Sequence, residues 1–115
     1  MKAIKINPMD MQITEIDLPE MEDGSVWVEA IRAHLGCKYF DVVRINNKGD
    51  GIFVDDEGLY RQGIQGVFRT TWYPEPIIGC GIVMGCSPSG DSIEPTITLR
   101  DVIENCEMGT AIPVN

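Results

Sequence analysis

The stretch that decides the fold is Phe40-Asp41-Val42-Val43-Arg44-Ile45-Asn46-Asn47-Lys48-Gly49-Asp50-Gly51-Ile52-Phe53-Val54-Asp55-Asp56-Glu57-Gly58. Two apolar runs, 40–45 and 52–54, flank a polar segment rich in Asn and Gly. Asn and Gly tolerate positive φ angles, so this segment can reverse the chain between two strands. The acidic residues 55–57 and Gly58 then form a second, exposed reversal. The stretch predicts a β-hairpin at the centre of a small sheet-based domain.

Short segments before this hairpin predict two further strands. Residues 2–6 alternate polar and apolar side chains, and a turn containing a proline separates them from residues 11–18. The residues of the second segment that we expect to face inward are Met11, Ile13 and Leu18. Ile16 breaks the alternation, so a bulge or an early end of this strand is expected. The two segments predict an N-terminal hairpin.

Helical spacing of apolar residues predicts two helices. The first covers residues 25–35, begins after an acidic segment in which Ser25 or Asp23 can serve as N-cap, and is ended by Gly36. Its apolar stripe consists of Trp27, Ala30, Ile31, His34 and Leu35. The second covers residues 96–106, where Thr98 predicts the N-cap and Asp101 its capping-box partner. The apolar stripe of this second helix consists of Leu99, Val102, Ile103 and Cys106.

The remaining segments predict strands and loops. A short strand near residues 67–73 should be ended by Pro74-Glu75-Pro76, and the apolar run 77–84 predicts a strand buried on both faces. Residues 86–95 predict a surface loop, and the tail from Met108 is expected to be loosely attached. The sum is an α+β fold, with two helices and a mostly antiparallel sheet of five to six strands. We expect residues 1–115 to form a single domain.

Composition limits the possible functions. The chain has 115 residues with 18 acids and 9 bases, a formal net charge of -9. A negative field repels phosphates and therefore disfavours direct nucleic-acid binding, but it attracts basic protein surfaces. The charge could also serve solubility alone. No apolar run of about 18 residues predicts a membrane helix, and no signal peptide is apparent, so we expect a cytoplasmic location in a host cell.

Reactive groups are few and unpaired in the sequence. The cysteines form no C-x-x-C motif and are expected to pack as small buried hydrophobes: Cys37, Cys80, Cys86 and Cys106. His34 lies on the apolar stripe of the first helix, where a bond to a backbone carbonyl is the expected role. No lysine follows Lys48, so the glycine-rich segments lack the phosphate-loop signature. The sequence predicts no enzyme, no cofactor and no metal site.

Several side chains are instead candidates for contact with a protein partner. The acidic candidates are Glu20, Glu22, Asp23, Asp55, Asp56 and Glu57. Residues 55–57 are the densest acidic group, although an exposed hairpin turn explains them equally well. Trp72 and Tyr73 are the aromatic candidates, because Tyr and Trp are frequent interface hot spots. The alternative is that one fills the core and the other caps a sheet edge.

Three segments together resemble a family of small uncharacterised phage and plasmid proteins. They are Asp41-Val42-Val43-Arg44, Phe53-Val54-Asp55-Asp56-Glu57-Gly58 and Pro76-Ile77-Ile78-Gly79-Cys80-Gly81-Ile82-Val83. Members of this family pair a strand that ends in D-E-G or E-E-G with a later I-x-G-x-x-V-V-x-G run, here residues 77–85. The family has no agreed activity, so the resemblance implies an origin in a mobile element and no catalytic residue.

The small size, the negative charge and this resemblance together predict an inhibitor of a bacterial defence system, similar to an anti-CRISPR protein. The expected mechanism is stoichiometric binding, in which carboxylates occupy the site where a basic host protein or complex binds nucleic acid. This requires the acidic side chains to gather on one face. The alternative hypothesis is a protein that sequesters a small nucleotide or other small molecule near the glycine-rich strand.

Overall fold

The computed structural model describes residues 1–22 and 28–112. The expected N-cap residues of the first helix, the acidic candidate Asp23 and Trp27 lie outside the described residues. Within the described residues the chain forms nine strands and two α-helices. They are β1 (Lys2–Asn7), β2 (Gln12–Asp17), α1 (Val28–Leu35), β3 (Phe40–Arg44), β4 (Asp50–Asp55), β5 (Gln65–Thr70), β6 (Tyr73–Ile78), β7 (Gly81–Cys86), β8 (Ser92–Ile93), α2 (Leu99–Glu104) and β9 (Cys106–Ala111), with a short 3₁₀ turn η1 (Gly58–Tyr60) after β4.

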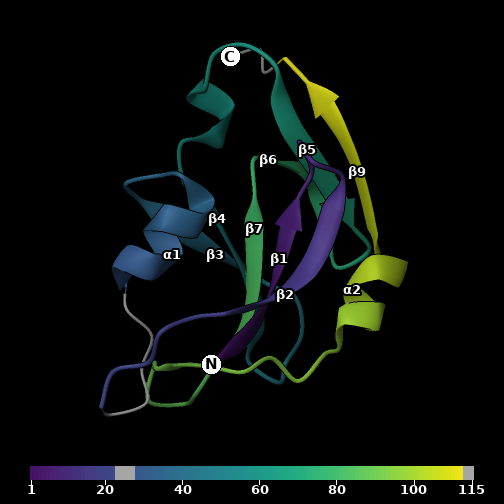
Figure 1. Ribbon diagram of the computed structural model, residues 1–115. Coiled ribbons are helices and arrows are strands. Elements are labelled where there is room, and N and C mark those ends of the chain that lie inside the picture. Colours follow the sequence, from purple (N-terminus) through teal and green to yellow (C-terminus); the bar gives the residue numbers. More distant parts are fainter. Residues whose placement is uncertain (23–27, 113–115) are drawn as a thin grey trace.

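The strands form two antiparallel sheets. The larger has six strands, in the order β2-β1-β7-β4-β3 with β8 paired to β7, and the smaller has the order β6-β5-β9. Figure 1 shows α1 on one side of the larger sheet, with the smaller sheet and α2 on the other side of the molecule. The predicted α+β class is confirmed, and so is the β3–β4 hairpin. The second sheet was not expected from the sequence.

Both faces of the larger sheet are buried, because each is covered by a different element. Successive side chains on a strand point to opposite faces. On one face Ala3, Phe53 and Ile82 pack against Ile31 and Leu35 of α1. The other face packs against the smaller sheet and α2; the residues of this second cluster include Ile4, Ile52, Val83, Phe68, Ile77 and Val102. Central strands covered on both faces need apolar residues at nearly every position.

This two-sided burial explains the irregular pattern of β2. The register of β1 and β2 is continuous from Lys2 opposite Asp17 to Asn7 opposite Gln12, so the expected bulge is wrong. Ile13 packs on the cluster that contains Ile4, whereas Ile16 packs on the α1 side. Leu18 is buried as expected, but Met11 is 59% exposed and lies in the turn with a φ of 55°.

Three predictions about the second half of the chain are wrong. Pro74 and Pro76 do not end a strand: they lie within β6, which is an edge strand and can therefore hold residues that donate no N–H. The apolar run 77–84 is divided between β6 and β7 by a turn in which Gly79 has a φ of 93°. The tail is ordered as far as Ala111, because β9 pairs with β5 from Cys106 opposite Thr70 to Ala111 opposite Gln65.

The helix ends follow the predicted chemistry. The Thr98 side chain accepts a hydrogen bond from the Asp101 N–H at 3.1 Å, and the Asp101 carboxylate accepts one from the Thr98 N–H at 2.9 Å. The predicted capping box is confirmed. Gly36 has a φ of 65° and the Cys37 N–H donates to the Arg32 carbonyl at 3.2 Å, which ends α1 as expected. In α2, Val102 is buried but Ile103 is 51% exposed, so the buried face of this helix is narrower than the predicted apolar stripe.

Candidate functional site

The acidic residues after β4 differ in their surroundings. The Asp55 side chain is only 8% exposed and accepts a hydrogen bond from Arg61 Nε at 2.9 Å. Its other oxygen accepts the Glu57 N–H at 2.9 Å. The hydrogen bond to Asp55 and the charge of this carboxylate raise the pKa of Arg61. Asp56 and Glu57 are exposed to solvent. One of the three predicted partner residues is therefore already paired within the chain.

The structure places part of this group beside an expected aromatic residue. Asp55, Asp56 and Tyr73 line one hollow of about 190 Å³, which we call the acidic hollow. Its other acidic lining residues are Asp41 on β3 and Glu75 on β6, which the sequence did not single out. Among the described residues that line it, none is Lys or Arg. Carboxylates from three separate segments thus meet around one tyrosine.

Asp41 and Glu75 could not be selected from the sequence, because their neighbours in the chain suggest other roles. Asp41 lies within an apolar strand and faces the same side as Val43, which packs on the core next to β6. Glu75 lies between two prolines that were interpreted as the end of a strand. Only the packing of β6 near β4 brings Glu75 to the end of the hairpin. No local pattern encodes this contact.

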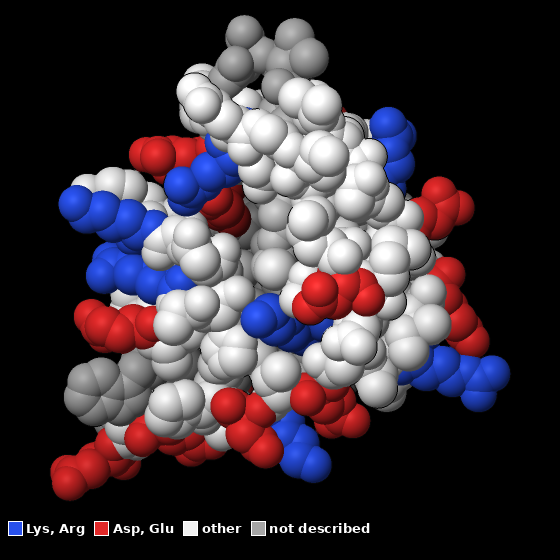
Figure 2. All heavy atoms as spheres, turned by 45° about the horizontal axis from the view of Figure 1, so that its top comes forward, with Lys and Arg blue, Asp and Glu red and all other residues white. Residues whose placement is uncertain are grey.

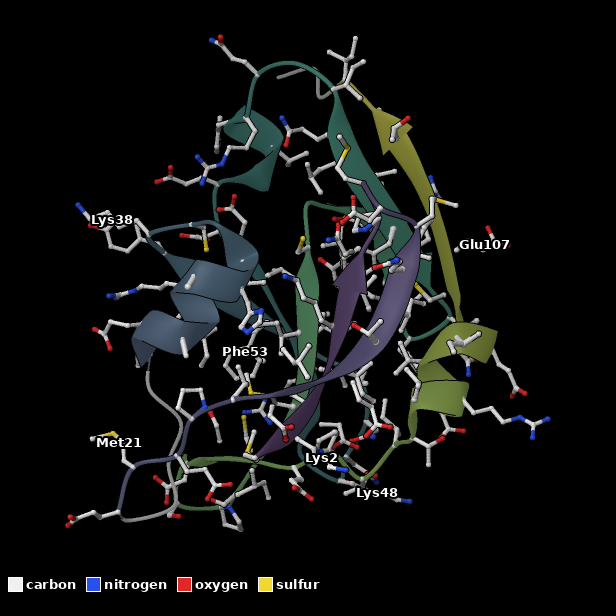
Figure 3. The ribbon with its side chains drawn as sticks, viewed as in Figure 1. Lys2, Met21, Lys38, Lys48, Phe53 and Glu107 are labelled. Atoms are coloured by element: carbon white, nitrogen blue, oxygen red, sulfur yellow. The ribbon has the colours of Figure 1, made fainter. Side chains whose placement is uncertain are left out.

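The other predicted acids lie elsewhere. The N-terminal ammonium of Met1 lies 2.8 Å from Glu20 Oε1 and also donates to the Leu18 carbonyl. Glu22 is exposed on the same segment. Figure 3 places neighbouring Met21 at the lower left of the molecule, whereas η1, directly after residues 55–57, is at the upper left in Figure 1. The two acidic groups do not form one patch.

Acidic side chains do not cover a whole face. On the face in Figure 2, red and blue side chains are interspersed around a broad uncharged area at the top. Glu15 and Glu94, distant in sequence, line one small hollow, but Lys2 lies between them. Asp101 is used in the capping box, and Glu104 accepts a hydrogen bond from Arg100 Nε at 2.8 Å. The expectation of a single negative face is not met on the face shown, although several acidic side chains lie along its lower edge.

Trp72 and Tyr73 lie where β5 turns into β6. Both are partly buried, and both pack against the same core cluster as Phe68. Neither residue is fully exposed, and Tyr73 begins the edge strand β6. Tyr73 reaches the acidic hollow, whereas Trp72 does not line it. Glu57 lines a different hollow, together with Arg61 and Lys38.

Their surroundings shift the pKa values of two thiols and of the histidine. Burial, and then the charge of Asp55, raise the pKa of Cys37, and burial raises the pKa of Cys106 to about 11. His34 Nδ1 lies 3.4 Å from Lys5 Nζ rather than on a backbone carbonyl, so the expected partner is wrong. Burial and the Lys5 charge lower the pKa of His34. Within residues 1–22 and 28–112, no hydrogen bond links His34 to Cys37.

The described residues contain no cluster of three or more His, Cys, Asp or Glu side chains arranged to hold a metal ion. Neither α1 nor α2, the two described helices, is long and apolar enough to cross a membrane. Comparison of the chain with protein-family models, with curated proteins and with solved structures gives no match.

Proposed function

We propose that this protein is a stoichiometric inhibitor that binds a basic, nucleic-acid-binding host protein through the acidic hollow. A lysine or arginine side chain of the partner enters the hollow. This side chain can then no longer bind the partner's nucleic acid. The observation that carries the proposal is the meeting of Asp41, Asp56 and Glu75 with Asp55 around Tyr73, with no Lys or Arg among the described lining residues. The role is binding rather than catalysis, in the cytoplasm of a host cell.

The local electrostatics favour such a contact. A hollow lined by charges of one sign between low-dielectric walls concentrates the field and raises the rate of encounter with a cation. Tyr73 lines the hollow, and an aromatic ring attracts the side chain of an arginine or lysine. Arg61 approaches only Asp55 within ion-pair distance and holds this side chain in place. The remaining carboxylates of the hollow form no ion pair within residues 1–22 and 28–112.

The class of partner follows from the overall charge and from the resemblance to phage and plasmid proteins. A net charge of -9 disfavours nucleic acid as the ligand and favours surfaces that normally hold it. Effector complexes of bacterial defence systems expose arginines that read DNA phosphates and bases. We therefore propose a phage-type, anti-CRISPR-like role, in which the inhibitor and DNA compete for the same basic site.

The test is a DNA-binding assay with purified guide-RNA-loaded effector complexes, with and without the inhibitor at equal concentration. We expect one effector to lose DNA binding, with an affinity for the inhibitor that falls as salt is raised. The variant Asp41→Asn/Asp56→Asn/Glu75→Gln should lose this inhibition.

The matched control removes three charges at other exposed positions, as Glu15→Gln/Asp17→Asn/Glu22→Gln. It should inhibit like the unmodified protein, because none of its changes lies in the acidic hollow. The proposal fails if the control loses inhibition to the same extent, since net charge alone would then explain binding. Inhibition that is insensitive to ionic strength also contradicts it.

A further inference from the structure

A large cavity lies at the other end of the central hairpin. Two loops form it, the β3–β4 turn and the β7–β8 turn, and its volume is about 680 Å³. We call it the loop groove. Its described lining residues are Val42, Arg44, Asn46, Asn47, Lys48, Gly49, Asp50, Gly51, Cys86, Ser87, Pro88 and Gly90. Volumes of roughly 300–1,000 Å³ are typical of sites for small molecules.

Hydrogen bonds hold both loops in place. The Cys86 N–H donates to the Gly49 carbonyl at 2.7 Å, which joins one loop to the other. Within the first loop, Asn46 Oδ1 accepts from the Lys48 N–H at 2.9 Å and from the Asp50 N–H at 3.1 Å. Within the second, Ser87 Oγ accepts the Asp91 N–H at 3.1 Å. The walls of the groove are therefore formed before any ligand arrives, which lowers the entropic cost of binding.

The groove carries two cations that the chain leaves unpaired. Arg44 and Lys48 form no ion pair within residues 1–22 and 28–112, although the protein has twice as many acids as bases. The one carboxylate in its lining belongs to Asp50, which is 1% exposed. The oxygens of Asp50 are bound to Asn46 and Thr96, and its charge also acts on Lys48, so it offsets one of the two positive charges. The accessible charge of the groove is positive.

The groove and the acidic hollow lie on opposite faces of the larger sheet. On β3, Val42 packs on the α1 side and Val43 on the opposite side. Because side chains alternate along a strand, Arg44 is on the same face as Val42, and Asp41 is on the same face as Val43. A ligand in the groove is thus separated from the carboxylates of the hollow by the sheet.

We propose that the loop groove binds a phosphate-bearing small molecule of about nucleotide size. Arg44 offers a planar fork of donors and Lys48 a point charge, and both groups bind phosphate oxygens. Val42 and Pro88 supply apolar contact for the organic part, while Asn47 and Ser87 supply polar groups for its hydroxyls. Gly90 has nothing within 4 Å of its Cβ position, so its backbone is open to close approach. This site is independent of the acidic hollow and of the proposed inhibitor role.

The experiment is a titration of the ¹⁵N-labelled full chain with ADP, adenosine and inorganic phosphate, with affinities from calorimetry. ADP should shift the amide signals of Gly49, Gly51 and Gly90, while inorganic phosphate binds more weakly and adenosine does not bind. Lys48→Gln and Arg44→Gln should each weaken ADP binding by about tenfold or more, since each removes a charge-assisted contact. No binding of ADP at millimolar concentration would overturn the proposal.

Lys38→Gln is the matched control for Lys48→Gln. Figure 3 shows these two lysines at opposite ends of the molecule. The control should bind ADP like the unmodified protein, and an equal loss in both variants would overturn the site. Adenosine binding as tight as ADP would overturn the role of phosphate, and inorganic phosphate binding as tight as ADP would overturn the nucleotide size.

Discussion

Asp50 and Asp55 begin and end the same strand, β4, yet the protein uses them in opposite ways. Asp50 is 1% exposed, and its carboxylate accepts hydrogen bonds from the Thr96 N–H at 2.8 Å, from the Thr96 hydroxyl and from Asn46 Nδ2 at 2.8 Å. The Asp55 side chain is also largely buried, at 8% exposure, but its hydrogen bonds come from Arg61 Nε and the Glu57 N–H, each at 2.9 Å. Asp50 thus joins the hairpin turn to a distant segment of the chain, whereas Asp55 bonds only to near neighbours in sequence.

The difference shows that a dense group of acids is a weaker sign of importance than a single well-bonded one. Residues 55–57 attracted attention because three acids occur in succession, whereas Asp50 looked like an ordinary turn residue. A buried charge is stable only when its hydrogen bonds are complete, and removing it leaves buried donors without partners. The following predictions test this contrast, from the largest effect to the smallest.

Asp50→Ala should lower the free energy of unfolding by about 3 kcal/mol, because it leaves the Thr96 N–H and Asn46 without their acceptor and opens a small cavity. Urea unfolding followed by circular dichroism measures the change. The exposed acid at the other end gives the control: Asp56→Ala should stay within about 0.5 kcal/mol of the unmodified protein. Equal losses in the two variants would contradict the contrast.

Gly49→Ala should cost about 2–3 kcal/mol. Gly49 has a φ of 96°, and an added Cβ would lie 2.5 Å from the Cys86 carbonyl oxygen. Gly63, on the Asp55 side, has a φ of 79° but nothing within 4 Å of its Cβ position. Gly63→Ala should therefore cost only the backbone strain, about 1 kcal/mol. Thermal unfolding of both variants measures the difference, and identical values would show that the loop contact is not stabilising.

Acid should weaken the fold partly through Asp50. Burial raises the pKa of this carboxyl, but the hydrogen bonds from Asn46 and Thr96 and the Lys48 charge outweigh it, so the pKa lies below its usual value. The unfolded chain then binds the proton first, and the stabilisation is present above about pH 4 and is lost as the pH falls through the folded pKa. Unfolding midpoints between neutral pH and pH 2.5 should fall less steeply in Asp50→Asn. Parallel pH profiles would exclude this role.

Arg61→Gln should lower the free energy of unfolding by less than about 1 kcal/mol, because exposed ion pairs contribute little in water. The same variant should leave inhibition by the acidic hollow intact or improve it, since Asp55 then lacks its internal partner. Urea unfolding and the DNA-binding assay provide the two measurements. A loss comparable to that of Asp50→Ala would mean that the two ends of β4 are alike after all.

Local chemistry was sufficient to predict some of these elements. The capping box of Thr98 and Asp101 was predictable because both partners lie within one turn of helix. The β3–β4 hairpin was predictable because an Asn- and Gly-rich turn separates two apolar runs. The role of Gly36 followed from the need for a positive φ at the end of α1. In each case the interacting residues are neighbours in sequence.

The predictions that were wrong concern residues whose partners are distant in sequence. β6 can contain two prolines because it is an edge strand. Its position at the edge is set by its pairing with β5. β9 is ordered by six pairings with β5, from about 40 residues earlier in the chain, and its own residues show no strong pattern. Ile16 looked misplaced because the sequence does not show that both faces of the sheet are covered.

The sequence by itself determined the turns, the caps, the α+β class and the excess of negative charge, since these depend on residue type and near neighbours. The tertiary structure alone decided which charges meet. Asp41, Asp55 and Glu75 come together, and within residues 1–22 and 28–112 Arg44 and Lys48 form no ion pair, because strand pairing joins distant segments in one register. A site needs groups at fixed positions in space, and strand order, rather than spacing along the chain, sets those positions.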